Sequence, residues 1–252
     1  MTGATGRLGS VLVDRIVTGG GRVRALSRCP NAPRPGVEPF VSDLRTGSGL
    51  DAALAGVDVV VHCATTNGRG DVRVMRNLVA AAQRAGGPHV VFVSIVGVDR
   101  IPLFYYRAKL ESERLLADSG LPWTVLRATQ FHSLVARLFD LQHRAPVFLV
   151  PAGVRVQPVD TGDVAERLAE LVAQGPEGRT ADIGGPEVRT VRELAVLYAR
   201  ARGLRRAVLP VPLPGAAARA YRAGGNLVPA GAPGRTTFAD HLEARVSGGC
   251  GA

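Results

Sequence analysis

Apolar positions in the first half of the chain alternate between helical and extended spacing. Positions 8, 11, 12 and 16 repeat at helical spacing, and glycines at 19–21 end that helix. β-Branched residues then fill short runs that are typical of strands buried on both faces of a parallel sheet, at residues 23–26, 57–64, 89–94 and 123–126. Helical patterns separate the later runs, one after Asp71, which can cap it, and one from Pro102 to Gly120. The alternation predicts an α/β fold in which helices cover both faces of a doubly wound parallel sheet.

The alternation weakens after residue 128. Amphipathic helices are predicted near residues 131–141 and 164–172, and Thr190 with Glu193 forms a capping box for another helix. Residues 207–234 are rich in proline, alanine and glycine. We expect residues 1–128 to form the core, and residues 129–252 to complete the sheet and add a small C-terminal cap on the substrate side, within a single structural unit.

Composition is that of an ordinary globular protein. Of the 252 residues, 46% are hydrophobic and 21% are charged, which excludes a disordered or collagen-like chain. The three cysteines show neither CxxC spacing nor a histidine partner at ligand distance, so neither a disulfide framework nor a zinc site is predicted. The sequence shows no secretory signal and no apolar run of the roughly 18 residues that a membrane span needs. We therefore expect a cytoplasmic protein with no metal and no membrane contact.

Charge raises the question of a nucleic-acid partner. The formal net charge is +10, from 31 basic and 21 acidic residues. The arginines are dispersed and only 5% of residues are aromatic, so the basic stripe with interleaved aromatics that such a partner requires is missing. No nucleic-acid partner is expected. Lys109 is the only lysine among the 31 basic residues, a bias typical of a coding sequence that replaces lysine wherever arginine can serve.

The clearest motif opens the first predicted helix. Residues 2–9 read TGATGRLG, with glycines in a GxxGxxG spacing. Glycines there allow a tight turn and let the N–H groups of the helix N-terminus approach a pyrophosphate. Such a turn normally follows a strand, whereas only Met1 precedes it here, so we expect the first strand to be missing from this chain. The predicted phosphate contacts are Gly3, Thr5, Gly6, Arg7, Leu8 and Gly9.

The end of the strand at 23–26 indicates which dinucleotide the chain prefers. Ser27 and Arg28 follow it, and no acidic residue occurs between Gly19 and Glu38. An acid at this place holds the ribose 2′-OH of NAD, whereas arginine accommodates the 2′-phosphate of NADP. The sequence therefore favours NADP(H) over NAD(H), with Ser27 and Arg28 as phosphate contacts. The alternative is an exposed arginine without a specific role in an arginine-rich chain.

Tyr105 and Lys109 form a YxxxK pair on the helix after Pro102. Residues four apart share one helix face, so we expect the ammonium to lie beside the phenol and lower its pKa. Ser94, at the end of the preceding strand, is placed to hydrogen-bond the same substrate oxygen. A surface tyrosine with a solvated lysine is the alternative, but the retention of lysine at this one position favours catalysis. Because the interval from Ser94 is short, Tyr106 is the fallback for Tyr105.

Together these segments resemble the short-chain dehydrogenase/reductase superfamily, and more closely its atypical NmrA-like bacterial members, which are NAD(P)H-binding oxidoreductases. The resemblance covers most of residues 2–171 and includes VRALSR at 23–28, VVVHCATT at 59–66 and VVFVSIVGVD at 90–99. It implies a Rossmann-type fold. It also implies phosphate binding by the glycines and Arg28, Asp43 and Leu44 beside the adenine, Ala64 and Thr65 along the cofactor, and Ser94, Tyr105 and Lys109 as the catalytic group, with Lys109 also holding the nicotinamide ribose.

Two functions of different kinds fit these features. The first is NADPH-dependent reduction of a carbonyl or quinone-like small molecule, in which Tyr105 donates the proton. The second is a non-catalytic NADP(H)-sensing or assembly protein that uses the same glycines and Arg28. Neither the substrate nor the oligomeric state has a sequence signal. The histidines are expected to be structural or solvated, although His132 follows the last strand and could line the pocket.

Overall fold

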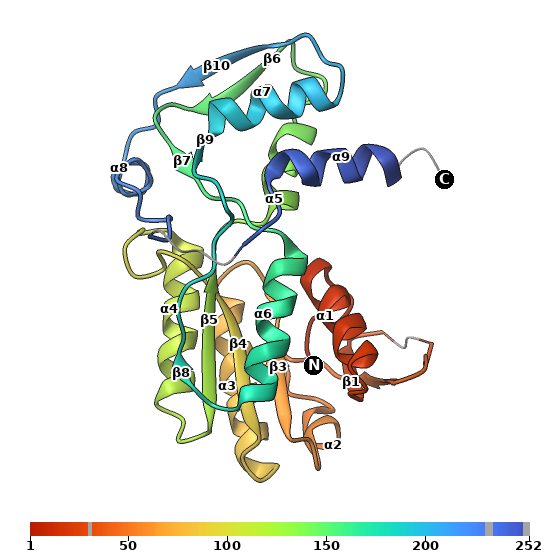
Figure 1. Cartoon of the computed structure of the whole chain (residues 1–252). Coiled ribbons are helices and arrows are strands. Elements are labelled where there is room, and N and C mark those ends of the chain that lie inside the picture. The colour runs from red at the N-terminus through yellow and green to blue at the C-terminus, as the bar shows by residue number, and fades with distance from the viewer. Residues whose placement is uncertain (30–31, 230–233, 249–252) are drawn as a thin grey trace.

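The computed structural model of the protein describes residues 1–29, 32–229 and 234–248; part of the Pro/Ala/Gly-rich segment and Cys250 lie outside these residues. A parallel sheet forms the lower half of the molecule (Figure 1). Its strands are β2 (Val37–Val41), β1 (Val23–Ser27), β3 (Val59–His62), β4 (His89–Ile95), β5 (Trp123–Ala128) and β8 (Gly178–Arg179), in spatial order. The prediction of a Rossmann-type doubly wound fold is confirmed.

Helices cover both faces of this sheet, and for that reason its central strands are continuous apolar runs. On one face, Val60 and Val90 pack with Met75 and Leu78 in a core that three helices complete: α2 (Leu50–Leu54), α3 (Gly70–Arg84) and α4 (Phe104–Ala117). On the other face, Val61, Val91 and Leu126 pack against α1 (Arg7–Thr18) and α6 (Thr161–Gln174). The predicted strands and helices of residues 8–126 are present, whereas β2 and α2 were not predicted.

Most elements after residue 128 form a second, smaller layer above the carboxyl ends of the strands (Figure 1). Phe139, Phe148, Tyr198 and Phe238 meet in its own apolar core. The capping box of Thr190 and the N-cap of α6 at Asp160 both form as hydrogen-bonded caps. The elements are α5 (His132–Asp140), β6 (Val147–Pro151), β7 (Arg155–Val156), β9 (Arg189–Thr190), α7 (Val191–Ala201), β10 (Ala207–Val211), α8 (Ala216–Arg222) and α9 (Phe238–Gly248).

Between β1 and β3 the sheet is joined through the first two residues. Thr2 bridges Leu26 on one side and His62 on the other, in parallel register. The Thr2 amide donates to the carbonyl of Val61 at 3.0 Å, and the Leu26 amide donates to the carbonyl of Met1 at 2.9 Å. In the described residues α1 is the first element, and residues 1 and 2 lie between the ends of β1 and β3.

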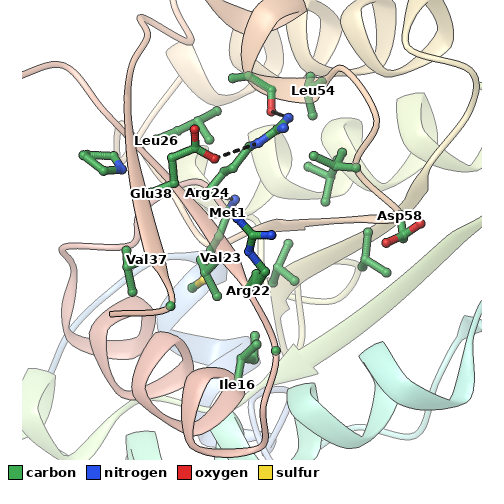
Figure 2. Close-up of a pocket in the computed structure, with 18 of the residues that line it drawn as sticks. Met1, Ile16, Arg22, Val23, Arg24, Leu26, Val37, Glu38, Leu54 and Asp58 are labelled. Carbon is green, nitrogen blue, oxygen red and sulfur yellow. Dashed lines mark hydrogen bonds and ion pairs between the residues drawn. The ribbon is translucent and has the colours of Figure 1, made fainter. Parts of the chain in front are cut away.

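Behind this bridge lies a cavity of about 820 Å³ (Figure 2). Successive residues of a strand direct their backbone N–H and C=O groups to opposite sides. These groups point toward the cavity at Arg24 and Leu26 on β1 and at Val59 and Val61 on β3. The cavity therefore lies between the facing edges of β1 and β3. Among the described residues that line it, none belongs to the predicted cofactor or catalytic set.

Candidate active site

The turn of residues 3–9 is built so closely that glycine is required at both of its ends. Gly3 has a φ of 67°, and a Cβ there would lie 2.8 Å from the amide nitrogen of Ala64. A Cβ on Gly9 would lie 1.9 Å from the carbonyl oxygen of Gly3. The Gly6 amide closes the turn by donating to that same oxygen at 2.9 Å. The turn thereby lies directly against residues 63–64 at the end of β3.

This turn leaves the N-terminus of α1 open to an anion. Gly6 is the N-cap, no side chain in the described chain caps the helix, and its first turn holds no acidic residue. N–H groups at such an end carry a partial positive charge. Thr5 and Arg7 are exposed beside it, whereas Leu8 is buried in the sheet core, so only its backbone faces the site.

The predicted adenosine side lies at the ends of β1 and β2. Arg28 is exposed, and the Ser27 hydroxyl donates to the carbonyl of Cys29. The Asp43 carboxylate accepts from the amide of Arg45 at 2.8 Å. The Leu44 carbonyl accepts from the side-chain amide of Asn77 at 2.9 Å. Both turns are thus held in place independently of a ligand.

Lys109 and Asp71 form a buried pair beneath this edge of the sheet. The Lys109 Nζ atom lies 3.7 Å from Asp71 Oδ2, and the two side chains are 5% and 4% exposed. Nζ also donates to the carbonyl of Val93 at 3.4 Å and lies 4.7 Å from the centre of the Phe92 ring. Burial lowers the pKa of Lys109, and the charge of Asp71 opposes that shift.

Tyr105 joins this pair through a threonine hydroxyl. The Thr65 Oγ1 atom donates to Asp71 Oδ2 at 2.7 Å and lies 3.1 Å from the Tyr105 hydroxyl. Thr66 donates to the other oxygen of Asp71 through its amide and, at 2.7 Å, through its hydroxyl. The structure therefore brings Thr65, Tyr105 and Lys109 together around Asp71.

The expectation that Lys109 lowers the pKa of Tyr105 is wrong for this arrangement. Burial raises the pKa of Tyr105 to about 12, and the charge of Asp71 adds to the rise, while the hydrogen bond with Thr65 opposes it. The ammonium lies 6.0 Å from the centre of the tyrosine ring, and its nearest charged partner is Asp71. The phenol is consequently protonated at neutral pH.

Ser94 lies at the carboxyl end of β4, 2% exposed, and its hydroxyl has no hydrogen-bond partner among the described residues. No hydrogen bond links it to Tyr105 in the described part of the chain. Tyr106, the fallback, points elsewhere: it is 5% exposed and its hydroxyl lies 2.8 Å from that of Tyr221 in α8. It therefore joins α4 to the cap.

His132 agrees with the main expectation for the histidines, whereas Asp71 differs from the expectation that it caps its helix. His132 is 1% exposed and packs against Thr236 and Phe238, so it is a core residue of the cap. Asp71 lies inside the first turn of α3, and the N-cap is Arg69. The sequence pattern indicated Asp71 as a helix cap because it precedes an apolar periodic run. Its closeness to Thr65 and Thr66 along the chain was the one sequence signal of a role in the site.

Comparisons with known proteins identify the family of this chain. Residues 3–174 match the NAD(P)H-binding family. The chain belongs to this family. It is also 33% identical, over 81% of its length and 73% of the relative's, to a (4-alkanoyl-5-oxo-2,5-dihydrofuran-3-yl)methyl phosphate reductase of Streptomyces griseus. Quinone oxidoreductase 2 of Escherichia coli is 26% identical over 81% of this chain and 74% of that protein.

Solved structures show the same fold. The NADPH-dependent quinone oxidoreductase of Escherichia coli in complex with NADPH superimposes with a TM-score of 0.84 at 22% identity, over 97% of this chain and 98% of that one. Triphenylmethane reductase of Citrobacter, complexed with NADP(H), gives a TM-score of 0.69 at 22% identity, over 96% and 93%. The predicted membership of an NAD(P)H-binding family is confirmed, and the relative that is 33% identical to this chain is a reductase. No helix in the described residues is long and apolar enough to cross a membrane.

Proposed function

We propose that this protein is an NADPH-dependent reductase that reduces the carbonyl or quinone-like carbon of a small molecule. The observation that carries the proposal is the direct packing of the glycine turn on the loop after β3. A Cβ on Gly3 would meet Ala64, and the next residue, Thr65, contacts Tyr105. A cofactor seated on the turn would therefore pass beside a protonated phenol.

The residues present fit such a cofactor. Gly3 and Gly9 leave room for backbone approach, and the uncapped N-terminus of α1 offers N–H groups to the pyrophosphate. Arg28, exposed at the end of β1, would contact the 2′-phosphate. The acidic residue on the adjoining strand β2 is Glu38, whose Oε2 atom lies 3.3 Å from Nε of Arg24. These features support NADP(H) over NAD(H).

NADPH supplies the hydride when it is bound. Tyr105 would donate its proton to the oxygen that gains negative charge, because a phenol with a pKa near 12 is protonated at neutral pH. Ser94 would donate a hydrogen bond to the same oxygen, which gives its buried hydroxyl a partner. Lys109 would provide an ammonium beneath the sheet edge, paired with the carboxylate of Asp71.

Oxidation of NADPH by the purified protein, with a panel of quinones and aldehydes as acceptors, tests this function. We expect Tyr105→Phe to lower kcat by about 10²-fold or more, the scale of general acid catalysis, while NADPH fluorescence still reports binding. Tyr106→Phe, which loses the hydroxyl contacts with Tyr221 and Gln130, is the matched control and is expected to retain most of the rate. A wild-type protein that binds NADPH and reduces none of the acceptors would overturn the proposal.

A non-catalytic NADP(H) sensor would use the same phosphate turn and Arg28. The relatives of this chain that are named reductase or oxidoreductase favour an enzyme over a sensor. A sensor predicts that Tyr105→Phe leaves every measured property unchanged. The salt-dependent binding of a DNA duplex would instead indicate a partner selected by charge.

A further inference from the structure

Asp71 has more partners than any role as a helix-terminal residue requires. One carboxylate oxygen accepts from the amide and hydroxyl of Thr66, and the other accepts from the hydroxyl of Thr65. The second oxygen also lies 3.7 Å from the ammonium of Lys109. The carboxylate thus ties helix α3 both to helix α4 and to the loop after β3.

That loop is held in an unusual backbone conformation. Asn67 has a φ of 57°, the only positive φ at a non-glycine position in the described residues, and its amide donates to the Thr65 hydroxyl oxygen at 3.0 Å. Left-handed backbone costs energy at a residue with a side chain and persists where the surroundings enforce it. The hydrogen bonds from Thr65 and Thr66 to Asp71 fix the chain on both sides of Asn67.

Counting donors gives the direction of the Tyr105 hydroxyl. A carboxylate only accepts, so the single hydrogen of the Thr65 hydroxyl is donated to Asp71. The Thr65 oxygen then accepts from the Asn67 amide and, at 3.1 Å, from Tyr105. Asp71 therefore determines, through Thr65, where the phenol hydrogen points.

We propose that Asp71 is the positioning residue of this site: it anchors the Lys109 ammonium and, through the Thr65 hydroxyl, orients the hydroxyl of Tyr105. The inference rests on the proposed reductase function insofar as Tyr105 is the proton donor. It replaces the direct lysine-to-tyrosine contact expected from the YxxxK spacing with a contact that runs through a second helix.

Because Lys109 is the only lysine, protein labelled with [¹³Cε]lysine gives one lysine resonance whose titration belongs to this ammonium. The groups around Lys109 are Asp71 from α3, His62, Cys63 and the Phe92 ring from β3 and β4, and Tyr105 and Glu113 from its own helix. We expect Asp71→Asn to lower the midpoint of that titration, since the charge of Asp71 raises the pKa of Lys109. Thr65→Val is expected to leave the midpoint in place. This measurement needs no turnover.

Kinetics then test the path through Thr65. Asp71→Asn and Thr65→Val are each expected to lower kcat by about 10-fold or more while KM for NADPH changes by less than about 3-fold, and Thr65→Ser is expected to restore the rate. Glu111→Gln is the matched control, because its carboxylate joins α4 to Arg76 of α3 at the exposed surface.

An unmoved Lys109 midpoint in Asp71→Asn, or a kcat no lower than that of Glu111→Gln, would overturn the inference. If Asp71→Asn fails to fold, Thr65→Val and Thr65→Ser carry the kinetic test. An inactive wild-type protein would count against the proposed function, whereas the lysine titration would still decide whether Asp71 holds Lys109.

Discussion

Arg127 donates two parallel hydrogen bonds to the carboxylate of Glu113. Its Nε and one terminal nitrogen donate to the two carboxylate oxygens at 2.8 and 2.6 Å, and the side chains are 7% and 10% exposed. The other terminal nitrogen donates to Asp99 at 2.8 Å. The pair fastens helix α4, which carries Tyr105 and Lys109, to strand β5.

Removing one partner of this buried pair should destabilise the fold strongly. Glu113→Ala leaves the guanidinium in a buried site with Asp99 alone, and the expected loss of unfolding free energy is about 3 kcal/mol. Urea denaturation measures it. Asp51→Ala, which removes the exposed carboxylate that Arg84 holds, is the matched change and should cost less than about 1 kcal/mol. Equal losses in the two variants would show that the burial of the Arg127 pair has no energetic weight.

Gly9→Ala should damage the phosphate turn. The new methyl group would lie 1.9 Å from the carbonyl oxygen of Gly3, so the turn or the helix must shift. We expect a loss of stability of about 1–3 kcal/mol and a loss of NADPH affinity of about 10-fold or more. Gly19→Ala at the other end of α1, where the nearest atom is 3.5 Å away, is the control for both measurements. An unchanged NADPH affinity in Gly9→Ala would count against cofactor binding at this turn.

Arg28→Ala should separate the two dinucleotides. If its guanidinium contacts the 2′-phosphate, the Kd for NADPH should rise by about 10-fold or more, the scale of a charge-assisted hydrogen bond, while the Kd for NADH stays the same. Isothermal titration with both cofactors checks this. Arg200→Ala removes an equal charge from an exposed position on α7 and should change neither constant. Parallel losses for NADPH and NADH would argue against 2′-phosphate recognition.

His62 should make the fold less stable in acid. Burial and, to a smaller extent, the charge of Lys109 together lower its pKa to about 3. The unfolded chain binds this proton near pH 6.5 and the folded protein only near pH 3, so stability present above pH 6.5 is lost progressively as the pH falls toward 3. We expect His62→Gln to flatten this part of the pH dependence relative to the wild type, with His89 and His132 still present. A ring resonance of His62 that titrates near pH 6.5 would contradict the prediction.

Filling the gap between β1 and β3 should stabilise the protein. Four added apolar residues ahead of Met1 could pair with both strand edges on the side of Arg22 and Val59, because residues 1 and 2 already bond the carbonyls of Arg24 and Val61. Their side chains would be buried in the cavity of Figure 2. Hydrophobic burial set against the ordering of four residues leaves a net gain on the order of 2 kcal/mol. Thermal unfolding measures the gain, and an equally long Gly-Ser extension is the control. Equal melting temperatures for the two extended proteins would show that the gap does not accept a strand.

Local pattern was sufficient for the central part of the sheet. The β-branched runs at β3, β4 and β5 are buried on both faces, and such strands have few alternatives to a parallel sheet covered by helices. Edge strand β2 was missed because it is only half-buried and contains Pro39, which weakens both of its sequence signals. Helix α2 was missed because five residues are too few to show a helical period.

The sequence by itself determined the fold, the glycine turn and the helix that presents Tyr105 and Lys109, since each depends on residues close together in the chain. Only the tertiary structure decided what those side chains meet. Asp71 on α3 pairs with Lys109 on the neighbouring helix α4, and Thr65 contacts Tyr105 from a loop 40 residues earlier in the chain. Helical spacing placed the lysine and the tyrosine on one helix face. In a buried site, however, the ammonium pairs with the nearest carboxylate, and spacing along one helix cannot reveal which carboxylate that is.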